Sequence, residues 1–238
     1  MPRHAPVPRE PLYHSQWRVR LAIIEYIPLL ATQLGVQAAG WFKNPVTKLE
    51  DLSGLNMRIA GLGGEAMRKV GVNAVLLPPP EIFSAFQSGA IDAAEWVGPM
   101  LDQAFGLQKV AKHCYVPAFH EPSAGLEIVV NKDAWDSLPK HLQAIITNAA
   151  DAANTETMAQ FDYFNALAMK QLEEAGVEFG TFPDDVVAAL KKASGEVMAE
   201  NADANPDFKK VMDSYNAFLD LARPYGVKVK APVFSQRG

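Results

Sequence analysis

The sequence has one cysteine and no excess of positive charge, and each shortage excludes a class of protein. Cys114 has no second cysteine to pair with and no histidine at metal-binding spacing, so it is predicted to be a small buried hydrophobe. Lysine and arginine number 22 against 27 aspartates and glutamates, a formal net charge of −5. Such a chain offers no basic surface to a phosphate backbone, and nucleic acid is not an expected partner.

Long hydrophobic runs are also missing. No apolar run reaches the roughly 18 residues of a membrane-spanning helix. The nearest approach to a targeting segment is 21–31, after Arg18 and Arg20, but Glu25 and Pro28 interrupt it, whereas the apolar region of a signal peptide is continuous. We therefore expect 1–33 to be an N-terminal stretch outside the core. With 238 residues, 49% of them hydrophobic, the remainder suffices for one large domain or two small ones.

The usual catalytic signatures are absent as well. There is no Gly-x-Ser-x-Gly, His-Glu-x-x-His, Cys-x-x-Cys or Walker motif, and the five histidines are scattered. One pattern does fit a cofactor site, because 61–66 (GLGGEA) satisfies G-x-G-x-x-A and Glu81 follows about 20 residues later. A Rossmann-type dinucleotide-binding enzyme is thus an alternative. Against it, the following helix ends at Gly71 and three prolines precede Glu81, so a tight strand-to-helix turn is the preferred explanation of the glycines.

What the sequence does contain is an alternation of short strands and helices. Apolar runs predict strands at 55–60, 74–77, 91–97, 115–116 and 125–130, the last with a buried apolar centre. Three- and four-residue apolar spacing predicts helices at 64–70, 81–88, 139–175, 184–202 and 207–222. The pattern is typical of an α/β fold with parallel βαβ units, in which ligands bind at the carboxyl ends of the strands.

Charged residues occur at the predicted strand ends. The guanidinium of Arg58 either lies on a solvated strand face or points into a cleft, where its fork matches a carboxylate. Glu95 and Trp96 close another predicted strand, and Glu121 follows in a loop. Two carboxylates near an anionic ligand repel it unless a cation bridges them, and oxygen ligands of this kind suit Na⁺ or Ca²⁺.

From about residue 34 to residue 225 the chain resembles the solute-binding proteins of TRAP transporters, in particular the branch that binds 2-oxo acids and related monocarboxylates. The residues that carry the resemblance are 35–42 (GVQAAGWF), 52–61 (LSGLNMRIAG), 81–82 (EI), 89–99 (GAIDAAEWVGP) and 120–122 (HEP). Residues 34–238 are assigned to this TRAP-like region. The resemblance implies a periplasmic-binding-protein-like α/β fold in two lobes, with a helical C-terminal part that includes one long helix.

The resemblance also implies a function without covalent chemistry. It predicts a periplasmic receptor, not an enzyme, that captures a small 2-oxo or 2-hydroxy monocarboxylate and delivers it to the membrane permease of the transporter. Arg58 would bind the ligand carboxylate, beside Gln37, Glu95 and Trp96. Gln37, Glu95, the Trp96 carbonyl and Glu121 would surround a bound Na⁺ or Ca²⁺. The long helix resembles one that supports a dimer in this branch, so a homodimer is expected, although a bent helix that folds back on its own subunit explains the sequence as well.

The chain also departs from the family pattern. Family members carry a longer first lobe than the 36 residues that precede Gln37 here, so the resemblance predicts an incomplete first lobe and an N-terminally truncated chain. Pro79 and Pro80 replace two glycines that usually precede Glu81. A non-functional fragment of the receptor is therefore a further alternative, which predicts that no ligand stabilises the chain.

Overall fold

The computed structural model describes residues 26–237. The predicted N-terminal stretch 1–33 falls largely outside the described residues. The described chain divides into two compact units, one formed by residues 29–128 and 139–198, the other by residues up to 28 together with 129–138 and 199 onward. No helix among the described residues combines the length and the apolar character needed to cross a membrane.

A six-stranded sheet organises the first unit. Its strands follow the order β4-β3-β5-β2-β6-β8. The bounds are β2 Gly40–Phe42, β3 Asn56–Arg58, β4 Asn73–Val75, β5 Ala93–Ala94, β6 His113–Tyr115 and β8 Glu178–Gly180. β2 is antiparallel to both of its neighbours, whereas β3 is parallel to β4 and β5, and β6 is parallel to β8. The predicted α/β class with parallel βαβ units is confirmed.

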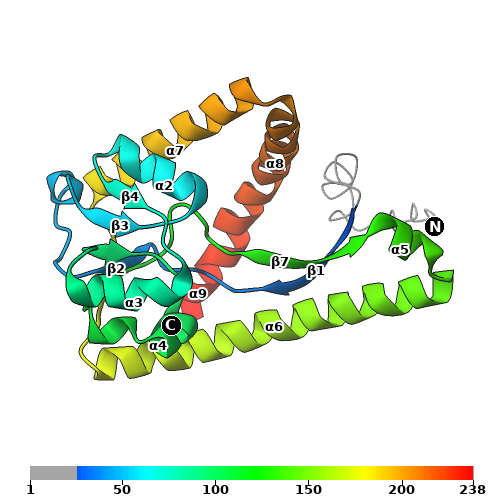
Figure 1. The fold of residues 1–238 in the computed structure, drawn as a ribbon, viewed down its shortest axis with the longest axis horizontal. Coiled ribbons are helices and arrows are strands. Elements are labelled where there is room, and N and C mark those ends of the chain that lie inside the picture. Colours follow the sequence, from blue (N-terminus) through cyan, green and yellow to red (C-terminus); the bar gives the residue numbers. More distant parts are fainter. Residues whose placement is uncertain (1–25, 238) are drawn as a thin grey trace. The chain divides into compact units, whose positions relative to one another are not determined.

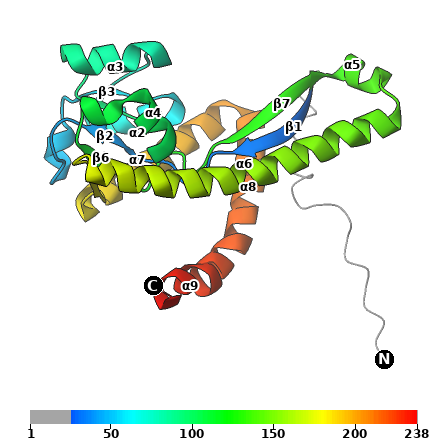
Figure 2. The same cartoon turned by 90° about the horizontal axis from the view of Figure 1, so that it is seen from below.

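Helices cover both faces of this sheet (Figure 1). They are α2 Gly61–Lys69, α3 Pro79–Ser88, α4 Pro99–Phe105, α6 Lys140–Glu174 and α7 Asp184–Ala204, with short 3₁₀ turns η1 Leu49–Leu52 and η2 Leu107–Lys109. The long helix predicted at 139–175 is confirmed as α6, a single unbroken helix of 35 residues. Figure 2 shows α4 packed on the part of α6 nearest the six-stranded sheet, while the rest of α6 extends past that sheet.

The core has one large apolar cluster on each face of the sheet. Alternation along β2 explains the division, because successive side chains of a strand point to opposite faces. Trp41 packs with Ile82 of α3 and Leu172 of α6, whereas Phe42 packs with Met67 of α2 and Val186 of α7. Cys114 lies in the same cluster as Trp41 and is 1% exposed, which confirms the prediction of a buried hydrophobe.

The strand predicted at 125–130 is present but it is not buried. Among the described strands, β7 (Gly125–Asn131) pairs only with β1 (Tyr26–Gln33), in a separate two-stranded sheet. Ile128 and Val129 are each 53% exposed. The predicted buried centre is therefore wrong, since three consecutive apolar residues indicate a strand but cannot show whether helices cover it.

The second unit is mainly helical. It contains α5 Lys132–Ser137, α8 Pro206–Tyr225, the π-helical turn η3 Gly226–Lys230 and α9 Ala231–Arg237, together with the end of α7 from residue 199. Asn205 caps α8, its side-chain oxygen accepting hydrogen bonds from the backbone N–H of Asp207 and Phe208 at 2.9 and 3.1 Å. The helix predicted at 207–222 continues to Tyr225, and residues 226–237, for which no element is predicted from the sequence, are helical.

Candidate functional site

One edge of the six-stranded sheet collects all of the predicted site residues. The register pairs Arg58, the last residue of β3, with Ala94, the last residue of β5, so Glu95 and Trp96 follow at the same edge. Because β2 is antiparallel to its neighbours, it begins at this edge, where Gly40 faces Tyr115 at the end of β6. Residues 37–39, 58–60, 95–98 and 116–122 therefore converge. All lie within the first unit.

Arg58 is buried at this edge, with 6% of its surface exposed. Its Nη1 donates to the Glu95 carbonyl at 2.6 Å and lies 3.2 Å from Glu95 Oε2, and its Nε donates to the Leu77 carbonyl at 3.4 Å. The Trp96 ring lies 5.4 Å from the guanidinium carbon. No acceptor among residues 26–237 takes a hydrogen bond from Nη2. Burial lowers the pKa of Arg58, and the Glu95 carboxylate opposes that effect. The alternative of a solvated strand face is excluded.

Glu95 is also buried, at 4% exposed, and faces two basic side chains. Its Oε2 pairs with Arg58, and its Oε1 lies 3.7 Å from Nε2 of His120, too far for a hydrogen bond. Neither ring nitrogen of His120 has a hydrogen-bond partner among the described residues, although the side chain is only 6% exposed. Buried polar atoms are rarely left in this state, so the arrangement is typical of a site that awaits a ligand.

Gln37 is fixed between two of the converging segments. Its N–H donates to the Pro122 carbonyl at 3.1 Å, and its carbonyl accepts from Ala118 N–H at 2.9 Å. The next residue, Ala38, donates to the Val97 carbonyl at 2.9 Å. The Gln37 side chain is buried, yet no donor in the described part of the chain reaches its Oε1. Gln37 thus presents an unused oxygen beside the segments of Trp96 and Glu121.

These oxygens fit the donor set that a hard cation requires. A buried amide oxygen without a partner and the buried Glu95 carboxylate lie on segments that hydrogen bonds join, whereas Glu121 is exposed at the edge. Within residues 26–237, no three His, Cys, Asp or Glu side chains form a metal-binding group. The predicted cation site does not require such a group of side chains, because it combines two carboxylates with an amide oxygen and a peptide carbonyl.

Asp102 was not predicted from the sequence, although it contacts the site through a hydrogen bond with Val97. It lies in α4 and is fully buried. Its Oδ2 accepts from Trp41 Nε1 at 2.7 Å, and its Oδ1 accepts from Val97 N–H at 3.1 Å. Burial raises the pKa of Asp102 to about 7, against the lowering effect of these hydrogen bonds. His120 was passed over as one of five scattered histidines, although it begins the 120–122 motif.

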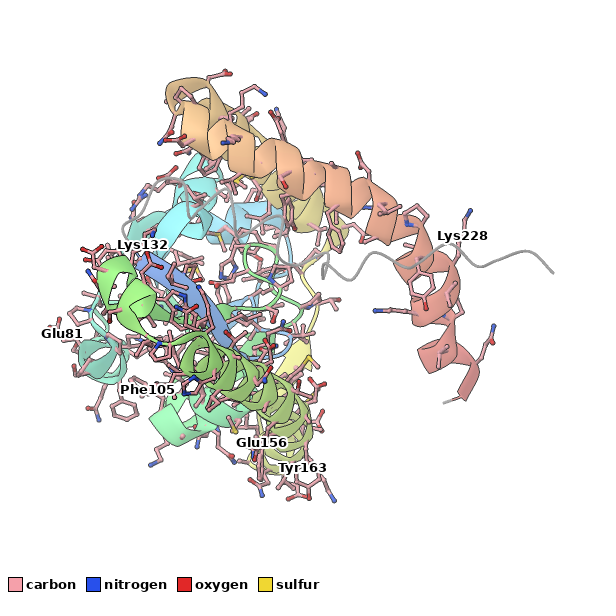
Figure 3. All side chains as sticks on the ribbon, turned by 90° about the vertical axis from the view of Figure 1, so that its right-hand side faces the viewer. Glu81, Phe105, Lys132, Glu156, Tyr163 and Lys228 are labelled. Atoms are coloured by element: carbon pink, nitrogen blue, oxygen red, sulfur yellow. The ribbon has the colours of Figure 1, made fainter. Side chains whose placement is uncertain are left out.

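The glycine motif at 61–66 has a structural explanation. Gly61 begins α2 with a positive φ of 58°, the left-handed conformation that glycine adopts readily. A Cβ atom on Gly63 would lie 2.9 Å from Cβ and Cδ2 of His120, so the helix approaches the site loop too closely for any side chain. Glu81, the expected ribose ligand, is exposed on the first turn of α3. Figure 3 shows Glu81 on the outer side of this helix. The dinucleotide alternative is not favoured.

The opposite edge of the sheet carries a cavity of about 190 Å³, whose polar lining includes Asn44, Asp51 and Asp92. Both carboxylates already accept hydrogen bonds from neighbouring residues. Asp51 Oδ2 accepts from the N–H and hydroxyl of Thr47 at 2.8 and 2.7 Å, and Asp92 Oδ2 accepts from Asn56 N–H at 3.0 Å. The unpaired buried atoms of Gln37 and His120 lie at the edge of Arg58, which is the better candidate site.

Comparison with known proteins identifies the family of the chain. The family model of bacterial extracellular solute-binding proteins, family 7, matches residues 27–205. The chain belongs to that family. A monocarboxylate 2-oxoacid-binding periplasmic protein from Nostoc is 41% identical over 188 residues, which are 79% of this chain and 52% of the relative. The chain therefore spans about half the length of this curated relative.

Two solved structures of TRAP solute-binding proteins share the fold. The protein from Bordetella bronchiseptica, a dimer with calcium and picolinate, is 33% identical, with a TM-score of 0.88 over 94% of this chain and 66% of its own. The protein from Pseudoalteromonas atlantica, with sodium and pyruvate, is 31% identical, with a TM-score of 0.85 over 93% of this chain and 68% of its own. The resemblance to TRAP solute-binding proteins and the predicted fold class are confirmed, and the family consists of binding proteins rather than enzymes.

Proposed function

We propose that this chain captures a small 2-oxo or 2-hydroxy monocarboxylate outside the cytoplasm, in the periplasm, and delivers it to TRAP membrane permease subunits without catalysing a reaction. The observation that carries the proposal is the buried Arg58 guanidinium with an unused Nη2 at the ligand edge of the sheet. The monocarboxylate class comes from the Nostoc relative, which binds 2-oxo acids, and from the pyruvate in the Pseudoalteromonas structure.

Arg58 binds the ligand carboxylate in this proposal. The guanidinium is held from one side by Glu95 and Leu77, which leaves Nη2 as the donor for an incoming anion. The Trp96 ring shields it from water, and Trp96 is in turn in contact with the ring of Phe105, 5.2 Å away. A charge-assisted bond in such a shielded place is stronger than the same bond in water.

A bound Na⁺ or Ca²⁺ makes the site compatible with an anion. Glu95 and Glu121 would otherwise repel a carboxylate. Gln37 Oε1, a Glu95 oxygen, the Trp96 carbonyl and Glu121 are the oxygens that would hold the cation, and the cation would supply positive charge to the 2-oxo or 2-hydroxy oxygen of the ligand. The calcium and sodium ions of the two solved relatives support this assignment.

A homodimer belongs to the same proposal. α6 exposes large apolar side chains along its length, namely Leu142, Ile145, Met158, Tyr163, Phe164 and Leu167. Tyr163 is 66% exposed and projects outward from the helix in Figure 3. The Bordetella relative is a dimer. Light scattering on the purified protein should give twice the mass of the chain, whereas a monomer at all concentrations would contradict this part.

The test is a thermal-shift screen against pyruvate, 2-oxobutyrate, lactate and C4 dicarboxylates, each with Na⁺, Ca²⁺ or a chelator. A ligand at a hundredfold excess over Kd stabilises the folded state by about 2.7 kcal/mol. We expect a cation-dependent rise in Tm with the monocarboxylates. Arg58→Lys should lose most of the rise, because it keeps the charge but not the fork, whereas Arg68→Lys on α2 should keep it. A cooperatively melting protein that no acid stabilises would refute the proposal.

A further inference from the structure

Asp102 is a buried carboxylate without a cationic partner. It is fully buried in α4, and no Lys, Arg or His of the described chain forms an ion pair with it. Burying an unpaired charge is costly, and the groups that accept such a cost commonly lie at functional sites. The two hydrogen bonds that Asp102 receives indicate its role.

One of these bonds comes from the peptide group that joins Trp96 to Val97. The N–H of Val97 donates to Asp102 Oδ1 at 3.1 Å, and the carbonyl of the same peptide group belongs to Trp96. A trans peptide is planar, with its N–H and C=O on opposite sides. A carboxylate on the N–H therefore directs the Trp96 carbonyl away from α4.

Neighbouring hydrogen bonds hold the rest of the segment. Glu95 N–H donates to the Arg58 carbonyl at 2.9 Å, and the Val97 carbonyl accepts from Ala38 N–H at 2.9 Å. The other oxygen of Asp102 accepts from Trp41 Nε1 at 2.7 Å, which ties the carboxylate to the centre of the sheet. The peptide between Trp96 and Val97 is thus fixed through Asp102.

We propose that Asp102 is a positioning residue that fixes the plane of the Trp96–Val97 peptide and polarises the Trp96 carbonyl, so that this carbonyl binds the cation more tightly. Hydrogen bonds in a chain strengthen one another, because each increases the charge separation of the next. The inference rests on the proposed function, in which the Trp96 carbonyl is a cation ligand. Partners one step behind a metal ligand typically change metal affinity by about 10- to 100-fold when removed.

The sequence permits a direct spectroscopic test. Trp followed by Val occurs once in the chain, at 96–97. Protein labelled with [1-¹³C]Trp and [¹⁵N]Val therefore gives a single amide-to-carbonyl correlation, which reports the Trp96 carbonyl and the Val97 N–H together. In wild-type protein at pH 8, addition of CaCl₂, and separately of NaCl, with pyruvate present should shift both the carbonyl carbon and the amide proton. A carbonyl shift without movement of the amide proton would refute polarisation through this peptide.

The matched variants are Asp102→Asn and Asp92→Asn. Asp92 also accepts a backbone N–H, that of Asn56, but at the opposite edge of the sheet. In Asp102→Asn we expect the Val97 amide proton to move upfield and the calorimetric Kd for Ca²⁺ to rise about 10- to 100-fold. Asp92→Asn should keep wild-type Ca²⁺ affinity.

The two proposals fail differently. If no cation moves the wild-type Trp96 carbonyl signal, the cation site itself is refuted, and the role of Asp102 with it. If the wild-type signal responds but Asp102→Asn binds Ca²⁺ as tightly as wild type, only the role of Asp102 is refuted. Should Asp102→Asn not fold, the coupled shift of carbonyl and amide in wild-type protein still decides the inference.

Discussion

Replacing Gly63 with alanine tests whether α2 is fitted against the site loop. The added Cβ would lie 2.9 Å from Cβ and Cδ2 of His120, closer than carbon atoms pack. The contact includes the His120 Cβ, which is fixed by the backbone, so α2 or the loop must move. Overpacking of this kind costs about 1–3 kcal/mol. Replacing a helical glycine with alanine recovers about 1 kcal/mol, so the net loss should reach about 2 kcal/mol.

Gly195→Ala is the matched control. Gly195 lies inside α7 and is exposed, and a Cβ added there would meet no atom within 4 Å, so its substitution should stabilise the protein by about 1 kcal/mol. The helix-propensity gain is common to both variants, and the difference between their free energies of unfolding isolates the steric cost. Urea titration measures both. Equal stability of the two variants would refute the close fit of Gly63 against His120.

Three further perturbations have defined outcomes in urea titration. Leu172→Ala, at a fully buried core position, should cost about 2–5 kcal/mol, whereas Leu76→Ala, 71% exposed, should change stability by less than about 0.5 kcal/mol. Tyr115→Phe should cost about 1–3 kcal/mol, because it leaves the N–H and carbonyl of Val46 without their partner. The pKa of Asp102 is raised from 3.8 to about 7, so the folded state holds a proton that the unfolded state has lost. The stabilisation that this bound proton provides is complete below about pH 4. As the pH rises from about 4 to about 7, the free energy of unfolding should fall by up to about 1.4 kcal/mol per pH unit, and Asp102→Asn should abolish this pH dependence.

The fold class and the position of the site could be predicted because both depend on local pattern. Alternating strand and helix patterns indicated parallel βαβ units. Ligands of such folds bind at the carboxyl ends of the strands, which pointed to Arg58 and Glu95. The structure brings these two side chains to 3.2 Å. The resemblance to the TRAP family supplied Gln37, which no local pattern singles out.

Contacts between residues distant in sequence could not be predicted. Asp102 accepts from Trp41, 61 residues away, and nothing near Asp102 in the sequence distinguishes it from a surface carboxylate on a short helix. The same limit explains the error on β7. Its apolar centre correctly indicated a strand, but burial depends on what covers a strand, and in the part of the chain that the structure describes β7 pairs with β1 alone.

The central claim is that Arg58 holds a small carboxylate in a cation-assisted site. Isothermal titration calorimetry of pyruvate into the purified chain, with CaCl₂ and then with a chelator, tests it most directly. The account predicts saturable binding that the chelator weakens and that Arg58→Lys loses, while Arg68→Lys retains it. Binding that is equally tight with chelator, or undiminished in Arg58→Lys, would contradict the account.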